Sequence, residues 1–139
     1  MVRSNRIKFY TFDSTDLTGD ATTGLIDTYT DNPLNGRIQS VYFEAGDWDA
    51  TGSMIISVSG TGTAGTILNQ VSGTAAERQL NEDWVVFPRV GTVDTTGVTI
   101  SGADGYDEFA EIPIWSHIRV QTGIVGTGSA ASGLTIIYI

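Results

Sequence analysis

His117 is the chain's only histidine, and imidazole is the side chain most often used as a general base near neutral pH. A serine nucleophile served by such a base commonly sits on a G-x-S-x-G turn, and the sequence contains no such string. Ser116 is adjacent to His117, so in a strand their side chains point to opposite faces. The chain also has no cysteine, which leaves a zinc site short of ligands. We therefore expect no catalytic residue and no bound metal.

Residues 60–65, GTGTAG, match the G-x-G-x-x-G string of dinucleotide-binding sites. Such a site needs a helix after the glycines, because the helix N-terminus holds the pyrophosphate, and an acidic residue about 20 positions further on. Here residues 66–71 are typical of a strand, and Glu77 and Glu82 come too early to reach a ribose. We interpret the string as a hairpin turn and expect no cofactor.

Two loops combine carboxylates with aromatic rings, residues 47–49 and residues 104–108. Paired carboxylates hydrolyse glycosides when they flank a cleft, and clustered carboxylates bind Ca²⁺. Runs of Asp and Gly are first of all turn formers, and neither loop has EF-hand spacing. Calcium binding therefore stays an alternative for these loops. So does a carbohydrate-binding module that uses Asp47, Trp48, Asp49 or Tyr106.

The charge balance argues against nucleic acid as a partner. The chain carries 16 Asp and Glu against 7 Lys and Arg, a formal net charge of −9. Such a chain repels a phosphate backbone and lacks the basic patch of a nucleic-acid-binding protein.

No segment approaches the roughly 20 apolar residues of a membrane helix, and the polar first six residues do not form a secretory signal. We expect a soluble protein that binds neither nucleic acid nor membranes.

The elements expected to carry these residues are strands. Short alternating segments separated by turns rich in Gly, Asp and Asn predict about eight to nine antiparallel strands in a single all-β domain over residues 1–139, a β-sandwich or jelly roll. The expected strands span residues 6–12, 24–30, 36–44, 53–59, 66–71, 83–88, 97–101, 115–122 and 134–139. At most one short helix is expected, near residues 75–82, where Thr74 and Glu77 form a capping box. Residues 1–5 are expected to be mobile.

The last segment, residues 134–139, carries no charged side chain. An exposed edge strand of that kind would promote aggregation. The segment is therefore expected either at the centre of a sheet or under a neighbouring subunit, and in the second case Tyr138 and Ile139 are interface residues. Trp48 lies in a polar turn, where a core position and a role as interface anchor are both open.

A family resemblance is carried by a series of short motifs in the last two thirds of the chain. In order, these are residues 35–41 (NGRIQSV), 53–58 (SMIISV), 87–90 (FPRV), 94–97 (DTTG) and 118–123 (IRVQTG). Over about residues 35–139, this order of glycines, the Pro-Arg pair and the strand rhythm resembles small β-sandwich virion proteins encoded among the head genes of tailed phages. The resemblance implies a capsid decoration (cement) protein and no catalytic residues.

The resemblance also implies a place and partners. A decoration protein binds the outer surface of the phage head, so the expected partners are the major capsid protein and further copies of the chain, as a homotrimer. Many weak contacts then act together through effective concentration. Arg3 and Arg6 are candidates to pair with acidic coat surfaces. Another virion part (tail, neck, baseplate or head fibre) is the main alternative.

Overall fold

The computed structural model describes residues 6–49, 52–59, 66–71, 79–91 and 109–139. This part of the chain forms eleven strands and no helix, and every strand pair is antiparallel. The all-β fold class predicted from the sequence is therefore confirmed. Within these residues, no helix has the length and apolarity required to cross a membrane.

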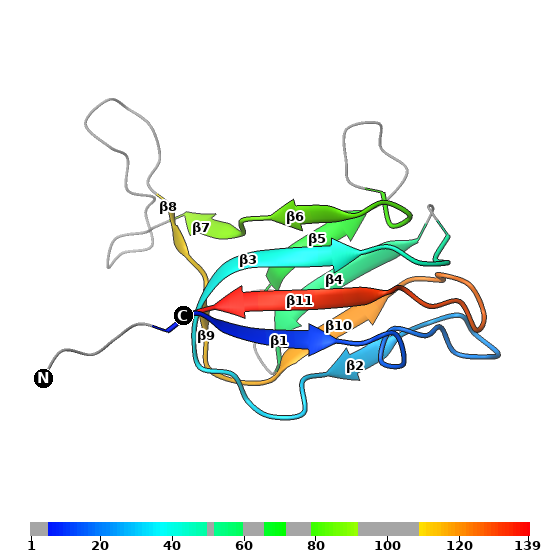
Figure 1. The fold of residues 1–139 in the computed structure, drawn as a ribbon, viewed down its shortest axis with the longest axis horizontal. Coiled ribbons are helices and arrows are strands. Elements are labelled where there is room, and N and C mark those ends of the chain that lie inside the picture. The colour runs from blue at the N-terminus through cyan, green and yellow to red at the C-terminus, as the bar shows by residue number, and fades with distance from the viewer. Residues whose placement is uncertain (1–5, 50–51, 60–65, 72–78, 92–108) are drawn as a thin grey trace, which may run out of the picture.

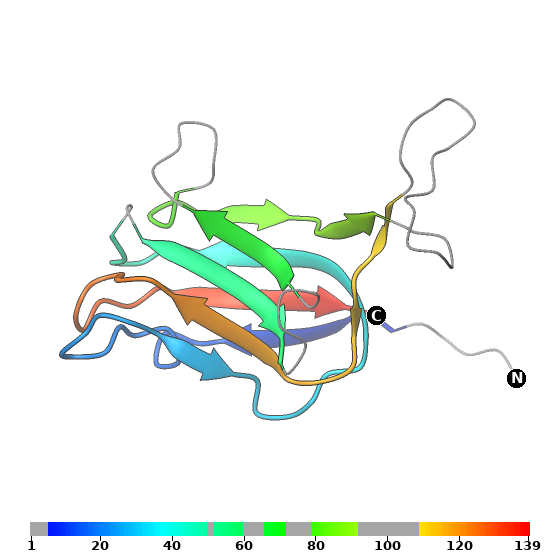
Figure 2. The ribbon, with the colours of Figure 1, turned by 180° about the vertical axis from the view of Figure 1, so that it is seen from behind.

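Two sheets face each other as a sandwich (Figures 1 and 2). The first sheet has the order β1-β11-β3-β6, with β9 paired to the start of β3. Its strands are β1 (Lys8–Phe12), β11 (Gly133–Tyr138), β3 (Gly36–Glu44), β6 (Trp84–Val86) and β9 (Pro113–Ile114). The second sheet has the order β2-β10-β4-β5. Its strands are β2 (Asp27–Tyr29), β10 (Ile118–Thr122), β4 (Ser53–Val58) and β5 (Thr66–Val71). A separate pair joins β7 (Arg89–Gly91) to β8 (Phe109–Glu111).

The core lies between the two sheets and follows the period-two alternation of the strands. In β4, Met54, Ile56 and Val58 are buried, while Ile55 is exposed. Opposite them, the first sheet contributes buried side chains from β11 and β3, among them Ile136 and Val41. The core is thus built by alternate residues of both sheets, as the sequence pattern predicted.

An aromatic cluster anchors one end of this core. The Phe43 ring is fully buried, with its centroid 5.0 Å from the centroid of Trp84 and 5.4 Å from that of Trp48. The indole N–H of Trp84 donates to the Gln79 carbonyl at 3.2 Å. Aromatic pairs in such contact contribute beyond the area they bury.

The uncharged terminal segment occupies the centre of the first sheet. Strand β11 pairs with β1 on one side and with β3 on the other. Its backbone groups are therefore used within the sheet, which resolves the edge problem that the sequence posed. The end of the chain is also tied down, because Arg37 N donates to Ile139 O and Ile139 N donates to Arg37 O, both at 3.0 Å.

Gly36, the first residue of β3, makes the close pairing of Arg37 with Ile139 possible. Its φ is +144°, and a Cβ at this position would lie 2.1 Å from the Ile139 carbonyl oxygen. Only glycine allows the two backbones to approach so closely.

Some sequence expectations differ from the structure in detail. Strands β7, β8 and β9 were not anticipated; each has only two or three residues, too few to show an alternation. The expected strand over residues 97–101 lies outside the described residues. Of the expected helix, residues 79–82 are not helical, with a turn and bend at residues 80–82, and the preceding residues 75–78 are not among those described.

The aromatic cluster yields a stability prediction. Replacing Phe43 by Ala should lower the free energy of unfolding by about 3–5 kcal/mol, because the lost ring leaves a cavity between two tryptophans. Urea unfolding followed by far-UV circular dichroism measures this loss. The matched control is Phe87→Ala, at a side chain that is 65% exposed, which should change stability by less than about 0.5 kcal/mol. Equal losses for both variants would contradict the assigned core.

Candidate docking surface on the outer sheet face

The first sheet turns a second set of side chains away from the core. In β1, Phe12 is fully buried and Phe9 is exposed; in β3, Phe43 is fully buried and Tyr42 is exposed. Figure 1 looks onto this outward side, with β1, β11, β3 and β6 in front of the second sheet. We call the outward side chains of these four strands, together with Phe87 directly after β6, the outer face.

Two rows of paired residues cross the middle of the outer face. In the first row, the register places Phe9 beside Ile137 and Ile137 beside Ser40. Phe87, the residue directly after β6, completes this row on the other side of Ser40. In the second row it aligns Thr11, Thr135, Tyr42 and Val85. Neither row contains a charged side chain.

The exposed part of these rows is largely apolar. Phe9 is 66% exposed, Phe87 65% and Val85 47%, and Ile7, just before β1, is 59% exposed. Ser40 points outward but is only 7% exposed, so it lies low between larger neighbours. Single exposed apolar residues are ordinary, but a contiguous patch on a sheet marks a surface that another molecule covers.

Figure 2 looks onto the second sheet, which presents different side chains to the outside. There Arg119 donates to both carboxylate oxygens of Asp27, at 2.8 and 2.7 Å, and its guanidinium lies 5.3 Å from the Tyr29 ring centroid. Hydrogen bonds from Arg119 hold the pKa of the Asp27 carboxyl below its ordinary value. Gln121 and Ser57 on neighbouring positions are also polar. This surface is more polar than the outer face of the first sheet, although Ile55 and Tyr29 are also partly exposed on it.

Charges on the outer face stand at its two ends. Arg37 is exposed at the start of β3, where Ile38 points into the core. Glu44 ends the same strand, and the exposed Asp83 precedes β6 beside it. The pKa of Tyr42 is raised, first by partial desolvation of its hydroxyl and then by the negative charges of Glu44 and Asp83. The outer face therefore has a basic end, an apolar middle and an acidic end.

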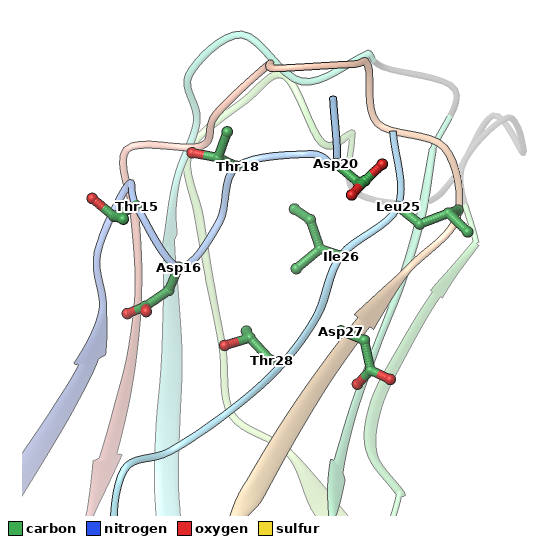
Figure 3. A pocket seen from close by; sticks show the side chains of 8 residues that line it. All are labelled: Thr15, Asp16, Thr18, Asp20, Leu25, Ile26, Asp27 and Thr28. Carbon is green, nitrogen blue, oxygen red and sulfur yellow. The ribbon is translucent and has the colours of Figure 1, made fainter. Parts of the chain in front are cut away.

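A hollow of about 450 Å³ lies elsewhere, between the loop after β1 and the segment that leads into β2 (Figure 3). Several of its polar side chains already have protein partners. Asp20 Oδ1 accepts from the N–H groups of Thr22 and Thr23 at 2.8 and 2.9 Å, which lowers the pKa of Asp20. Thr18 Oγ1 donates to the Ser14 carbonyl at 2.6 Å, and Asp27 is paired with Arg119. In the described part of the chain, no group of acidic or histidine side chains is arranged to hold a metal ion.

The residues predicted to form an interface lie in different environments, some buried and some exposed. Trp48 is 3% exposed, and its indole N–H donates to the Leu17 carbonyl at 2.9 Å, so the core alternative describes its position. Tyr138 is 9% exposed, with Lys8 Nζ 5.4 Å from its ring centroid. Ile139 is half-buried, and its backbone pairs with that of Arg37. Arg6 is exposed before β1, and Arg3 lies outside the described residues.

The residues considered as catalytic or ligand-binding candidates do not come together in one site in the described part of the chain. His117 is half-buried, and its carbonyl accepts from Ser59 N at 2.8 Å. Asp47 and Asp49 are exposed, but the ring of Trp48 between them is in the core and does not offer a sugar-stacking surface. Residues 60–65 and Tyr106 are not among the described residues. The segment after the glycine string forms β5, as the sequence predicted.

Comparison with known proteins identifies no relative: no protein-family model, no curated protein and no solved structure matches the chain significantly.

Sequence reasoning missed the outer face itself. The available signal was that β1 and the segment around β6 carry large apolar residues at both parities: Phe9 beside Tyr10 and Phe12, and Val85 and Phe87 beside Val86. A strand that faces water on one side normally alternates apolar with polar residues.

The Asp27–Arg119 pair yields a pH prediction. The folded-state pKa of Asp27 lies below its ordinary 3.8, so the pair stabilises the fold at neutral pH, and this contribution is lost as the pH falls below about 4. Asp27→Asn should therefore lower the melting temperature at pH 7, and the difference from the parent should vanish at a pH below the lowered pKa. Thermal melts from pH 7 to pH 2 measure it. An undiminished difference at the acidic limit would contradict the assignment.

Trp48 yields a second prediction. Trp48→Phe keeps a ring in the core but removes the indole N–H that donates to the Leu17 carbonyl. Because that carbonyl retains Ala131 N as a donor, the free energy of unfolding should fall by about 0.5–1.5 kcal/mol. Trp115→Phe is the control, because Trp115 is 57% exposed, and it should leave stability unchanged. Chemical denaturation of both variants measures the difference, and an unaffected Trp48→Phe protein would refute a structural role for the indole.

Proposed function

We propose that the chain is a non-enzymatic structural protein of a tailed-phage virion, a capsid decoration (cement) protein bound to the outer surface of the head. The observation that carries the structural role is the apolar outer face of the β1-β11-β3-β6 sheet. Such a face is suited to contact with another protein surface. The assignment to a phage head is supported by the resemblance of residues 35–139 to small virion proteins.

The fold suits this role mechanically. The outer face is built on paired strands, with β11 held on both sides, and its residues are ordered before any partner arrives. A preorganised surface loses little conformational entropy on binding, so a modest contact area can still give useful affinity. Repetition over a symmetric shell multiplies modest contacts through effective concentration.

The charge distribution suits a protein on the outside of a particle. The chain has a net charge of −9, and the outer surface of the second sheet carries polar groups and an ion pair. A negatively charged, hydrated surface keeps such a protein soluble before assembly and repels like surfaces afterwards. The proposed partners in the shell are the major capsid protein and further copies of the chain.

The number of copies in the particle tests this proposal. Purified particles should contain the chain on the head in hundreds of copies, and particles made without it should lose integrity at a lower temperature. Adding back purified protein should restore heat resistance, because the contacts are non-covalent.

Two variants sharpen the test. Val85→Glu places a charge in the apolar middle of the outer face and should fail to restore heat resistance. Ile55→Glu places the same charge on the second sheet, at a side chain that is 38% exposed, and should restore it. A dozen copies or fewer would instead favour a tail or neck protein, and absence from the particle would overturn the proposal.

A further inference from the structure

We propose that a second copy of the chain covers the outer face, with the two sheets packed face to face about a two-fold axis and their strands antiparallel. The acidic end of each copy then lies over the basic end of the other. This inference deepens the proposed function, because it names a further copy of the chain, one of the two proposed partners, as the molecule that covers the outer face. It holds whether or not the protein belongs to a virion.

The first argument is the order of charges along the strands. Strands β1 and β3 both run antiparallel to β11, so they start at the same end of the sheet. Arg37 stands at the start of β3 and is exposed. Lys8 is the first residue of β1, but it shares the inward parity of Phe12 and lies over the Tyr138 ring, so Arg37 is the cation that the outer face presents at this end. This is also the end where the chain's C-terminus lies (Figure 1).

The opposite end of the sheet is acidic. Glu44 is the last residue of β3, Asp83 precedes β6 next to it, and Asp13 follows β1. These three carboxylate side chains are exposed. One sheet therefore carries opposite charges at its two ends, with an uncharged middle between them.

A two-fold axis can place the acidic end of one copy's sheet against the basic end of the other copy's sheet. In an isologous interface, if residue i contacts residue j, then j also contacts i. With the axis midway between the two sheets, parallel to them and perpendicular to the strands, Arg37 of each copy faces Glu44 of the other. With the axis parallel to the strands, ends of like charge would meet instead, which costs free energy. The charges therefore select the antiparallel arrangement.

The second argument is the sizes of the side chains in the two middle rows. The axis lies between the rows, so each residue of one row faces the residue two positions along the same strand in the other copy. Ile137 then faces Thr135, Ser40 faces Tyr42, and Phe9 faces Thr11. A large side chain meets a small one in each pair. The match is closest near the axis, because face-to-face sheets cross at about 30°.

The expected contact is of modest size. Four strands about 4.8 Å apart, each contributing about 20 Å of length, give a flat footprint of about 400 Å² per copy. A standard interface covers about 800 Å² per partner, so the dimer should be a weak one, with a Kd in the micromolar range.

The first test is the mass of the full-length chain in solution. Sedimentation velocity and light scattering from about 1 to 500 μM, a range that brackets a micromolar Kd, should show the 14.8 kDa monomer converting to a species of twice that mass. A monomer at every concentration would overturn the inference and leave the outer face available to the coat protein. A trimer, which the family resemblance implies, would overturn it as well.

The second test is a charge exchange. Arg37→Glu and Glu44→Arg should each raise the Kd by roughly tenfold or more, because each homodimer then brings like charges together at both ends. An equimolar mixture of the two variants should recover dimers, since every facing pair is again of opposite charge. Asp83 is left unchanged because its carboxylate accepts from Ala45 N at 2.8 Å.

Gln121→Glu on the second sheet is the control and should dimerise like the parent. Melting temperatures of all the variants establish that each is folded. If the mixture of variants stays monomeric, or if Arg37→Glu dimerises normally, the antiparallel arrangement is wrong.

Discussion

The placement of β11 between β1 and β3 is the constraint on which the rest of the structure depends. Its inward residues, Leu134 and Ile136, are fully buried in the core, and its outward residues, Thr135 and Ile137, form the centre of the outer face. One strand therefore supplies both the fold and the candidate docking surface. Because both neighbours saturate its hydrogen bonds, the uncharged strand does not present an aggregating edge.

The outer sides of the two sheets differ in polarity. The second sheet presents polar side chains and the Asp27–Arg119 ion pair to water, which is compatible with a protein of net charge −9. The first sheet presents Phe9, Val85 and Phe87, which gain most from being covered. Its charges stand only at the ends of the strands, where they direct how a neighbour can approach. The proposed structural role needs solubility before assembly and specific contact during it, and this distribution of charge suits both.

The acidic residues of the described loops serve mainly local structure. Asp20 binds the N–H groups of Thr22 and Thr23, and Asp83 binds that of Ala45. A carboxylate that closes its own turn is less available to a ligand. The hollow beside Asp20 is explained in the same way, as space between loops whose polar groups bind one another.

The sequence alone determined the all-β class and most strands, because alternation and turn residues are local signals; the predicted ranges 36–44 and 66–71 coincide with β3 and β5. It did not determine which parity faces the core where both are apolar, as in β1, nor that the Trp48 indole binds Leu17, 31 residues away. The meeting of β1, β11, β3 and β6, and with it the segregation of charge along the outer face, was decided by tertiary structure. These strands come from distant parts of the chain, and only their pairing brings Phe9, Ile137 and Ser40 into one row.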